Sequence, residues 1–135
     1  MSEPIRNQKD ARGLPTGEWE ELFADGTRSA IVHYVGGVKH GESRYWYRNG
    51  QLKAIGSLDR GEFTGAWTWW RENGQLLQQG EFRDGKQIGP WKRYHATGAI
   101  MDEGEWVDGI RSGEWKYYDS NGELLRTKRH RVING

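Results

Sequence analysis

The sequence predicts an all-β protein: an open, twisted, single-layer antiparallel meander of five 24-residue β-hairpin repeats. A leading glycine recurs every 24 residues without insertion or deletion, at Gly17, Gly41, Gly65, Gly89 and Gly113. A second series closes each ten-residue segment, at Gly26, Gly50, Gly74, Gly98 and Gly122. The chain of 135 residues has 20 Gly, 8 Trp and 6 Tyr but only 3 Pro. This composition is typical of many short strands joined by tight turns.

Each unit is expected to contain two strands, which gives about ten strands in all. The first strand follows the leading glycine and ends at a pair such as Asn49-Gly50 or Asn73-Gly74. Asn-Gly favours a two-residue type I′ hairpin turn, in which both residues have positive φ. The second strand runs through segments such as QLLQQGEF and stops at Arg60-Gly61, Asp84-Gly85 or Asp108-Gly109.

The hairpin register follows from the turn. A two-residue turn at Asn73-Gly74 places Trp67 opposite Gly80 and Trp70 opposite Leu77. We therefore expect an indole ring to cover the backbone that a cross-strand glycine leaves bare. The same count predicts the pairs Trp91–Gly104, Tyr94–Met101, Trp115–Lys128 and Trp19–Val32. The end units depart from the Trp–Gly pattern, which we interpret as capping of the array.

Both faces of the predicted sheet carry an aromatic row, because residues three apart on a strand point to opposite sides. One row contains Trp19, Ser43, Trp67, Trp91 and Trp115. The other contains Leu22, Trp46, Trp70, Tyr94 and Tyr118. A single layer cannot bury both rows unless it coils or meets a partner, so some aromatic surface is expected to stay exposed.

The expected domain organisation is simple. Residues 1–16 form an N-terminal tail with a partial repeat, and residues 17–135 form one repeat domain with units at 17–40, 41–64, 65–88, 89–112 and 113–135. The 20 basic and 19 acidic residues nearly balance, which gives no global signal for nucleic acid or an anionic membrane. Cysteine is absent, which excludes disulfides and cysteine-based metal sites. Residues 1–10 are polar and have no signal-peptide pattern, so a cytoplasmic location is expected.

The consensus resembles the MORN-repeat variant family. It reads Gly-x-Trp-x-x-Tyr/Trp-x-x-Asn-Gly-x-Leu, followed by Gly-Glu-aromatic-x-Asp-Gly, as at Gly80–Gly85 and Gly104–Gly109, and it covers residues 17 to about 128. The resemblance implies an elongated, twisted sheet and a role as an interaction scaffold. It also suggests an antitoxin or immunity protein that neutralises a toxin by binding it, since one bacterial branch has that role.

Residues for catalysis are sparse in the sequence. His33 and His40 are able to approach each other across a turn, but no other His, Asp or Glu group has the spacing of a metal site. No serine lies in a nucleophile-elbow sequence. The glycine-rich stretch 36–41 is explained by turns, because no helix follows it. We therefore expect no enzymatic activity, no metal and no cofactor.

Nucleic acid, a membrane surface and carbohydrate are three other classes of ligand that aromatic and basic residues can bind. Arg44, Lys92 and Lys116 share one repeat position, and residues 126–131 are basic, but the balanced charge argues against nucleic acid. Membrane contact is not expected either, since no amphipathic helix or dense polybasic cluster is present. A carbohydrate-binding module stays open as an alternative, because Gly-Trp-aromatic repeats also occur in cell-wall-binding proteins. A general scaffold at a complex or membrane surface is the other alternative.

A protein partner is the preferred reading, with the protein either monomeric or paired through an exposed strand edge. Fold-maintaining positions repeat, whereas recognition positions vary, and the fifth and seventh positions of the units vary most. Tyr, Trp and Arg at these positions are the residue types most enriched at binding hot spots. The predicted partner-binding residues are Tyr45, Tyr47, Trp69, Arg71, Arg93, His95 and Tyr117.

Overall fold

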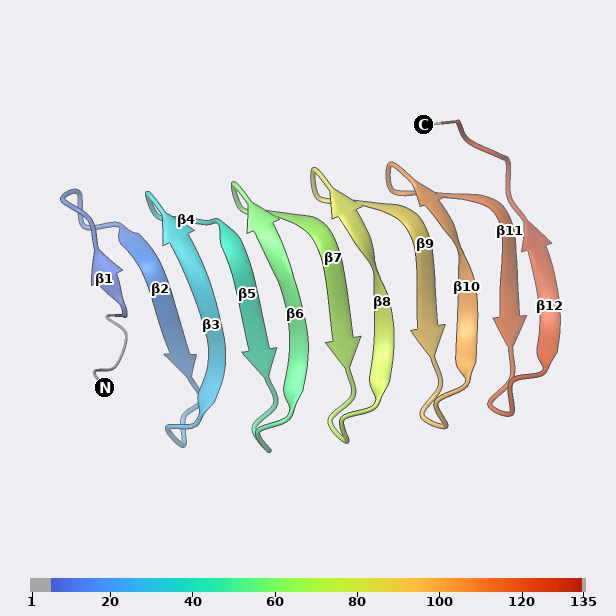
Figure 1. Ribbon diagram of the computed structural model, residues 1–135, viewed down its shortest axis with the longest axis horizontal. Helices are drawn as coiled ribbons and strands as arrows, with labels where there is room; N and C mark the ends of the chain where they lie inside the picture. The colour runs from blue at the N-terminus through green and yellow to red at the C-terminus, as the bar shows by residue number, and fades with distance from the viewer. Residues whose placement is uncertain (1–5, 135) are drawn as a thin grey trace.

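A computed structural model of the protein describes residues 6–134. Its strands form one antiparallel, open sheet whose spatial order follows the chain, apart from a short strand, β4, that pairs only with β3 (Figure 1). The strands are β1 Gln8–Lys9, β2 Pro15–Leu22, β3 Arg28–Val35, β4 Val38–Lys39, β5 Gly41–Trp46, β6 Leu52–Asp59, β7 Glu62–Trp70, β8 Leu76–Arg83, β9 Lys86–Tyr94, β10 Ile100–Val107, β11 Ile110–Tyr118 and β12 Leu124–Arg129. The predicted fold class is therefore confirmed.

Two details of the element prediction change. The sheet has twelve strands rather than ten, because two-residue strands β1 and β4 add to the five hairpins. The first strands of units three to five also begin about three residues before the leading glycine, as β7 does at Glu62. They begin early because the turns at Arg60-Gly61, Asp84-Gly85 and Asp108-Gly109 are the tight two-residue turns, with both residues at positive φ.

The Asn-Gly turns differ from the prediction. Gly74 has a φ of 91°, whereas Asn73 is absent from the residues with positive φ. Gly74 N–H donates to Arg71 C=O (2.9 Å), and Arg71 N–H donates to Gln75 C=O (2.7 Å). This is a three-residue loop, a type I turn closed by a left-handed glycine, rather than a two-residue type I′ turn. The Asn73 side chain stabilises it by accepting a hydrogen bond from Gln75 N–H (3.0 Å).

The longer loop changes the register at the end of each hairpin. Trp67 pairs with Gly80 and Trp91 with Gly104, as predicted. Trp70, however, pairs with Leu76 and Tyr94 with Ile100, so the predicted partners Leu77 and Met101 are wrong. One extra residue on the second strand, a β-bulge, absorbs the shift and restores the expected pairing further along the strand. The terminal pairs Trp115–Lys128 and Trp19–Val32 are confirmed.

The indole rings cover glycines, but not the ones they pair with. A Cβ built at Gly56 would lie 2.0 Å from the ring of Trp67, and Gly80 and Gly104 stand in the same relation to Trp91 and Trp115. Each ring therefore rests on the glycine of the preceding unit, on the opposite side of its own strand from the register partner. The prediction that an indole ring covers a cross-strand glycine is thus confirmed, but the strand was wrong: Trp67 covers Gly56 on β6 and not Gly80 on β8.

Both loop edges of the sheet tie successive units together. At the upper edge in Figure 1, the turn glycines donate N–H groups to carbonyls 22 residues earlier, for example Gly85 to Phe63 (3.1 Å) and Gly109 to Gln87 (2.9 Å). At the lower edge, side chains reach carbonyls 23 residues later, for example Asn49 Nδ2 to Glu72 O (2.8 Å). The upper-edge bonds join units one to four, and the lower-edge bonds join units two to five.

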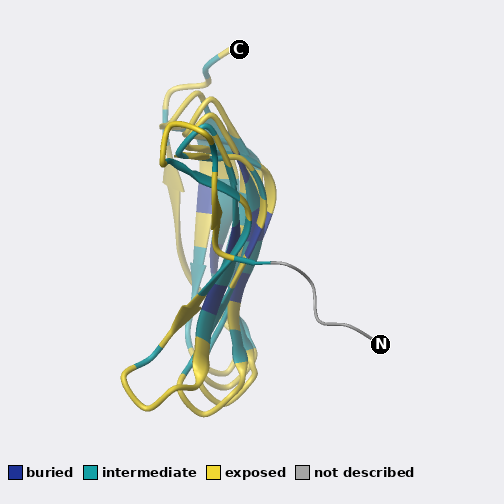
Figure 2. Ribbon diagram, turned by 90° about the vertical axis from the view of Figure 1, so that its left-hand side faces the viewer, coloured by how far each residue is buried: buried dark blue, intermediate teal, exposed yellow. Residues whose placement is uncertain are grey.

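Burial is concentrated in the middle of the strands. Figure 2 views the single layer nearly edge-on, with the buried positions inside the bowed sheet and exposed residues in the loops at both edges. The core residues are Ala30, Val32, Ala54, Leu58, Trp67, Trp91 and Trp115. Several of them lie on one side of the sheet, which we call the tryptophan face after Trp67, Trp91 and Trp115. Within residues 6–134, no helix is long and apolar enough to cross a bilayer.

Candidate functional site

The tryptophan face carries the predicted binding residues of the fifth position. Trp69 stacks on Trp67, with ring centroids 5.5 Å apart, and Tyr45 stacks on the same ring at 6.5 Å. Trp69 also lies 5.9 Å from Trp91 and 6.2 Å from Phe82, centroid to centroid. The structure thus brings Tyr45 and Trp69 together on one continuous aromatic surface.

Trp69 is a structural residue as well as a surface residue. From the sequence alone, Trp69→Ala is predicted to weaken partner binding and to leave thermal stability nearly intact. The substitution would remove ring contacts to Trp67, Phe82 and Trp91, so from the structure we expect it to lower stability as well. The ring is nevertheless only half-buried, so part of it faces solvent.

Further along the same row, Arg93 is held by a buried acid. The Arg93 Nε atom donates to both carboxylate oxygens of Asp102, at 3.1 and 3.0 Å, and a terminal nitrogen adds a third contact. Asp102 is 2% exposed, whereas the Arg93 side chain is 48% exposed. The hydrogen bond to Asp102 raises the pKa of Arg93. A fixed, half-exposed guanidinium loses little entropy when it binds a partner group.

Tyr117 ends the row. Its hydroxyl accepts a hydrogen bond from Arg111 (3.0 Å), and the guanidinium carbon of Arg126 lies 4.5 Å from the centroid of its ring. Arg111 also lies 4.6 Å from the ring of Trp115. Cations therefore surround this end of the tryptophan face, whereas rings fill its middle.

A small hollow lies between these two parts of the face. It has a volume of about 180 Å³ and is lined by Gln78, Gln87, Trp91, Arg93, Asp102, Trp106, Arg111 and Trp115. Several of these residues come from second strands and were missed by the sequence analysis, which considered only first-strand rows. The predicted register already places Gln78 opposite Trp69 and Asp102 opposite Arg93, so following each row across the hairpin would have identified these residues.

The seventh-position residues have a different role. Tyr47, Arg71 and His95 lie just after β5, β7 and β9, and each bonds the backbone of the next unit. Tyr47 OH donates to Trp70 O (2.7 Å), Arg71 Nη2 to Tyr94 O (2.8 Å), and His95 Nε2 lies 2.8 Å from Tyr118 O. Three different side chains thus form hydrogen bonds with equivalent carbonyls. This shared role explains the variation at the seventh position, and no binding partner is needed to account for it.

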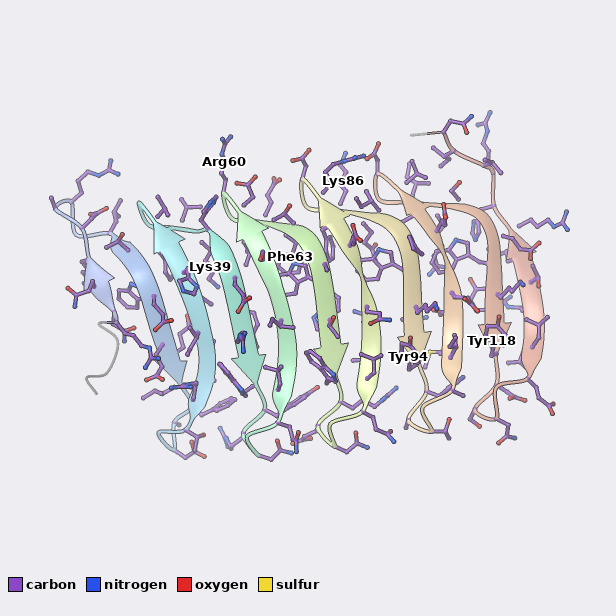
Figure 3. All side chains as sticks on the ribbon, in the orientation of Figure 1. Lys39, Arg60, Phe63, Lys86, Tyr94 and Tyr118 are labelled. Atoms are coloured by element: carbon purple, nitrogen blue, oxygen red, sulfur yellow. The ribbon has the colours of Figure 1, made fainter. Side chains whose placement is uncertain are left out.

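The opposite face has its own aromatic row, with Tyr94 and Tyr118 towards the lower ends of β9 and β11 (Figure 3). Tyr118 OH donates to Glu103 Oε2 (2.7 Å), and this bond raises the pKa of Tyr118. The hydroxyl of Tyr94 accepts from Gln79 Nε2 (3.3 Å). Both hydroxyls bond side chains on neighbouring strands. Substitutions of these tyrosines can therefore serve as controls for substitutions on the tryptophan face.

His33 and His40 are neighbours across a turn, since His40 N–H donates to His33 C=O (2.8 Å), but their side chains lie near different acids. His33 Nε2 lies 3.7 Å from Glu18, and His40 Nδ1 lies 3.4 Å from Asp59. No group of three or more His, Asp or Glu residues within 6–134 is placed to hold a metal ion.

Comparison with known families supports the repeat assignment. The MORN repeat variant family matches residues 39–59, 63–84 and 111–129. The chain is a MORN repeat protein. The matched segments lie mainly in units two, three and five, and each begins two residues before the leading glycine of its unit. It is therefore a repeat-type protein of the binding or scaffold class.

Other comparisons add little to this MORN protein. No curated protein matches the sequence. S. aureus TarM superposes with a TM-score of 0.42 and 12% identity, over 84% of this chain and 20% of that one. A GtfA/B complex bound to UDP and GlcNAc gives a TM-score of 0.31 and 13% identity, over 96% of this chain and 27% of that one. The chain spans only these small parts of both structures, and neither likeness carries a functional argument.

Proposed function

We propose that the protein is a non-catalytic antitoxin or immunity protein that binds a partner toxin and covers the toxin's active site. The observation that carries the proposal is the row Tyr45, Trp69, Arg93 and Tyr117, which presents partly exposed rings and a fixed guanidinium on one face. Such residues supply large contact area at low entropic cost. Tyr47, Arg71 and His95, the other predicted partner-binding residues, border the row, and we assign them to holding successive units together rather than to direct contact with the partner.

The geometry of an open sheet favours this mechanism. Successive units place equivalent side chains in line, so the surface is extended rather than concave enough to enclose a small substrate. The hollow beside Arg93 is small, at about 180 Å³. An extended face suits steric coverage of another folded protein better than chemistry on a small molecule.

The test is affinity capture of the tagged full chain from its native cells, with partners identified by mass spectrometry. One stoichiometric protein whose expression alone arrests growth, and whose effect co-expression of this chain relieves, supports the proposal. A set of structural or membrane-associated proteins would instead indicate a general scaffold. Retention on cell-wall polysaccharide with no captured protein would indicate a carbohydrate-binding module.

A further inference from the structure

The strand β12 is the last in the spatial order of the sheet, and all six of its residues are exposed. After it, the chain turns away from the sheet edge, as Figure 1 shows. Val132-Ile133 stands where the other units have a two-residue turn, and Ile133 N–H donates to Ser112 Oγ (2.8 Å). Within residues 6–134, no strand pairs with the outer edge of β12.

The outer edge of β12 presents backbone groups for pairing. Its inner edge pairs Arg126 with Tyr117 and Lys128 with Trp115, and His130 N–H donates to Gly113 C=O (2.8 Å). Backbone groups in an antiparallel strand alternate in direction. Thr127 and Arg129 therefore direct their N–H and C=O groups outward, as a template for another strand.

The side chains of β12 determine which kind of incoming strand can pair with it. Arg126, Lys128 and Arg129 give it three cations and no acid. Leu124 is 55% and Leu125 66% exposed, whereas the equivalent Leu76 and Leu77 are half-buried by the following unit. Arg129 lies 3.6 Å from Glu114, whereas Arg126 and Lys128 have no acid opposite them on β11. The edge thus combines apolar surface that a neighbouring strand would cover with two cations on the tryptophan face.

We infer that β12 binds an extended acidic segment of a partner protein by β-strand addition. The added strand continues the sheet, its backbone pairs with Thr127 and Arg129, and its Glu or Asp side chains on the tryptophan face lie opposite Arg126 and Lys128. This surface lies at the sheet edge and is tested with a synthetic strand, so it stands independently of the proposed antitoxin role.

A second copy of the chain is a poor occupant. The acidic strand β2 would offer matching charge, but its edge is already covered: Asn7 N–H donates to Glu18 O (2.9 Å), and the Asn7 side chain accepts from Glu20 N–H (2.7 Å). The strand β1 also pairs with β2. Pairing of β12 with β12 of another copy would bring six cations together, which is unfavourable.

At this edge, Lys128 replaces the glycine that the ring-on-glycine contact requires. It occupies the place of Gly104, where a Cβ would lie 2.2 Å from the ring of Trp115. A following unit with tryptophan at that place would therefore clash with Lys128. An acidic residue on the incoming strand avoids the clash and pairs with the ammonium group.

The full-length ¹⁵N-labelled protein can be titrated with a blocked eight-residue peptide of alternating glutamate and valine. We expect chemical-shift changes confined to β12 and its neighbours, and slowed amide exchange at Thr127 and Arg129. The matched peptide of alternating lysine and valine should not bind. Absence of protection at both amides, or equal binding of the lysine peptide, would overturn the inference. Shifts of β12 with a thymidine oligonucleotide but not with the glutamate peptide would assign the edge to nucleic acid instead.

Substitutions at one position separate strand addition from simple charge attraction. Thr127→Pro removes an outward N–H without removing a bond to β11, and it should weaken the glutamate peptide roughly tenfold, whereas Thr127→Ala should change affinity less than about twofold. Lys128→Glu should reverse the preference towards the lysine peptide. Unchanged affinity in a folded Thr127→Pro protein, or unchanged preference in Lys128→Glu, would refute the proposed pairing.

Discussion

The ring of Trp67 lies on the backbone of Gly56 so closely that a Cβ at Gly56 would be 2.0 Å from the indole. The indole N–H completes the contact by donating to Ser57 O (2.9 Å), a carbonyl next to the register shift between β6 and β7. Trp91 and Trp115 repeat this with Glu81 O (3.2 Å) and Glu105 O (3.1 Å). One contact therefore buries a large ring in a single-layer sheet and satisfies its polar atom.

Trp91→Ala tests the size of this contact. Trp91 is 4% exposed, and its truncation removes the ring from Gly80 together with the indole hydrogen bond. We expect a loss of about 3–5 kcal/mol in the free energy of unfolding, as for other large aromatic truncations. Urea denaturation followed by circular dichroism measures it. A loss below about 1 kcal/mol would contradict the ring-on-glycine packing.

Val32 and Ser43 provide a natural size exchange within the same array. They occupy the places of Gly56 and Trp67, and both are buried, at 0% and 1% exposure. The large residue has moved to the glycine place, and the small residue to the tryptophan place.

Copying this exchange into units three and four should show that the two positions are coupled. Gly80→Val alone should destabilise by about 1–3 kcal/mol or more, since its side chain would enter the Trp91 ring. Combined with Trp91→Ser, the valine side chain can occupy space that the indole leaves, so the double variant should be more stable than the sum of the single effects predicts. Additive effects in this double-mutant cycle would show that the two positions are not coupled.

The fold was readily predictable from the sequence because its period is unbroken and each unit repeats the same turn signals. The register near Trp70 was not, since Asn-Gly suits both a two-residue and a three-residue hairpin loop, and only the φ of Asn73 distinguishes them. The sequence also did not show which neighbouring strand carries the glycine that each indole covers, because a tryptophan between two strands can cover a glycine on either side.

The candidate site was predictable in part. The fifth-position row was placed on one face by strand alternation, and the stacking of Tyr45 and Trp69 on Trp67 agrees with that. The contacts of Tyr47, Arg71 and His95 with the next unit were not visible, because a loop side chain that bonds a carbonyl 23 residues away leaves no pattern in residue type. Variation there arises because tyrosine, arginine and histidine can all serve the same carbonyl.

Tyr47→Phe tests the role of this lower-edge ladder. It removes only the hydroxyl that donates to Trp70 O. We expect a loss of about 0.5–1.5 kcal/mol in stability, because one partly buried hydrogen bond is lost. Partner capture should be retained at nearly the wild-type level. Unchanged thermal stability combined with loss of the partner would assign Tyr47 to direct binding instead.

His130 should make the C-terminal end of the sheet sensitive to acid. Burial, with Lys128 and Arg111 nearby, lowers the pKa of His130 from its ordinary value of 6.5, and its ring lies 6.4 Å from that of Trp115. Below pH about 6.5 the unfolded chain therefore binds a proton more readily than the folded chain, so the free energy of unfolding falls as the pH is lowered. Between pH 7.5 and 5, the melting temperature should fall less in His130→Phe than in the wild-type protein, because phenylalanine keeps an aromatic ring but cannot bind a proton. An equal decrease in both proteins would exclude His130 as its source.

Adjacent tyrosines on opposite faces give the most direct test of the proposed docking surface. Tyr117 belongs to the row on the tryptophan face, whereas Tyr118 bonds Glu103 on the other face. Affinity capture from native cells should be repeated with Tyr117→Ala and Tyr118→Ala, with folding of both checked by circular dichroism. The account predicts that Tyr117→Ala loses the captured protein and Tyr118→Ala retains it. Retention by Tyr117→Ala with loss by Tyr118→Ala, or equal capture by both, would contradict binding through the tryptophan face.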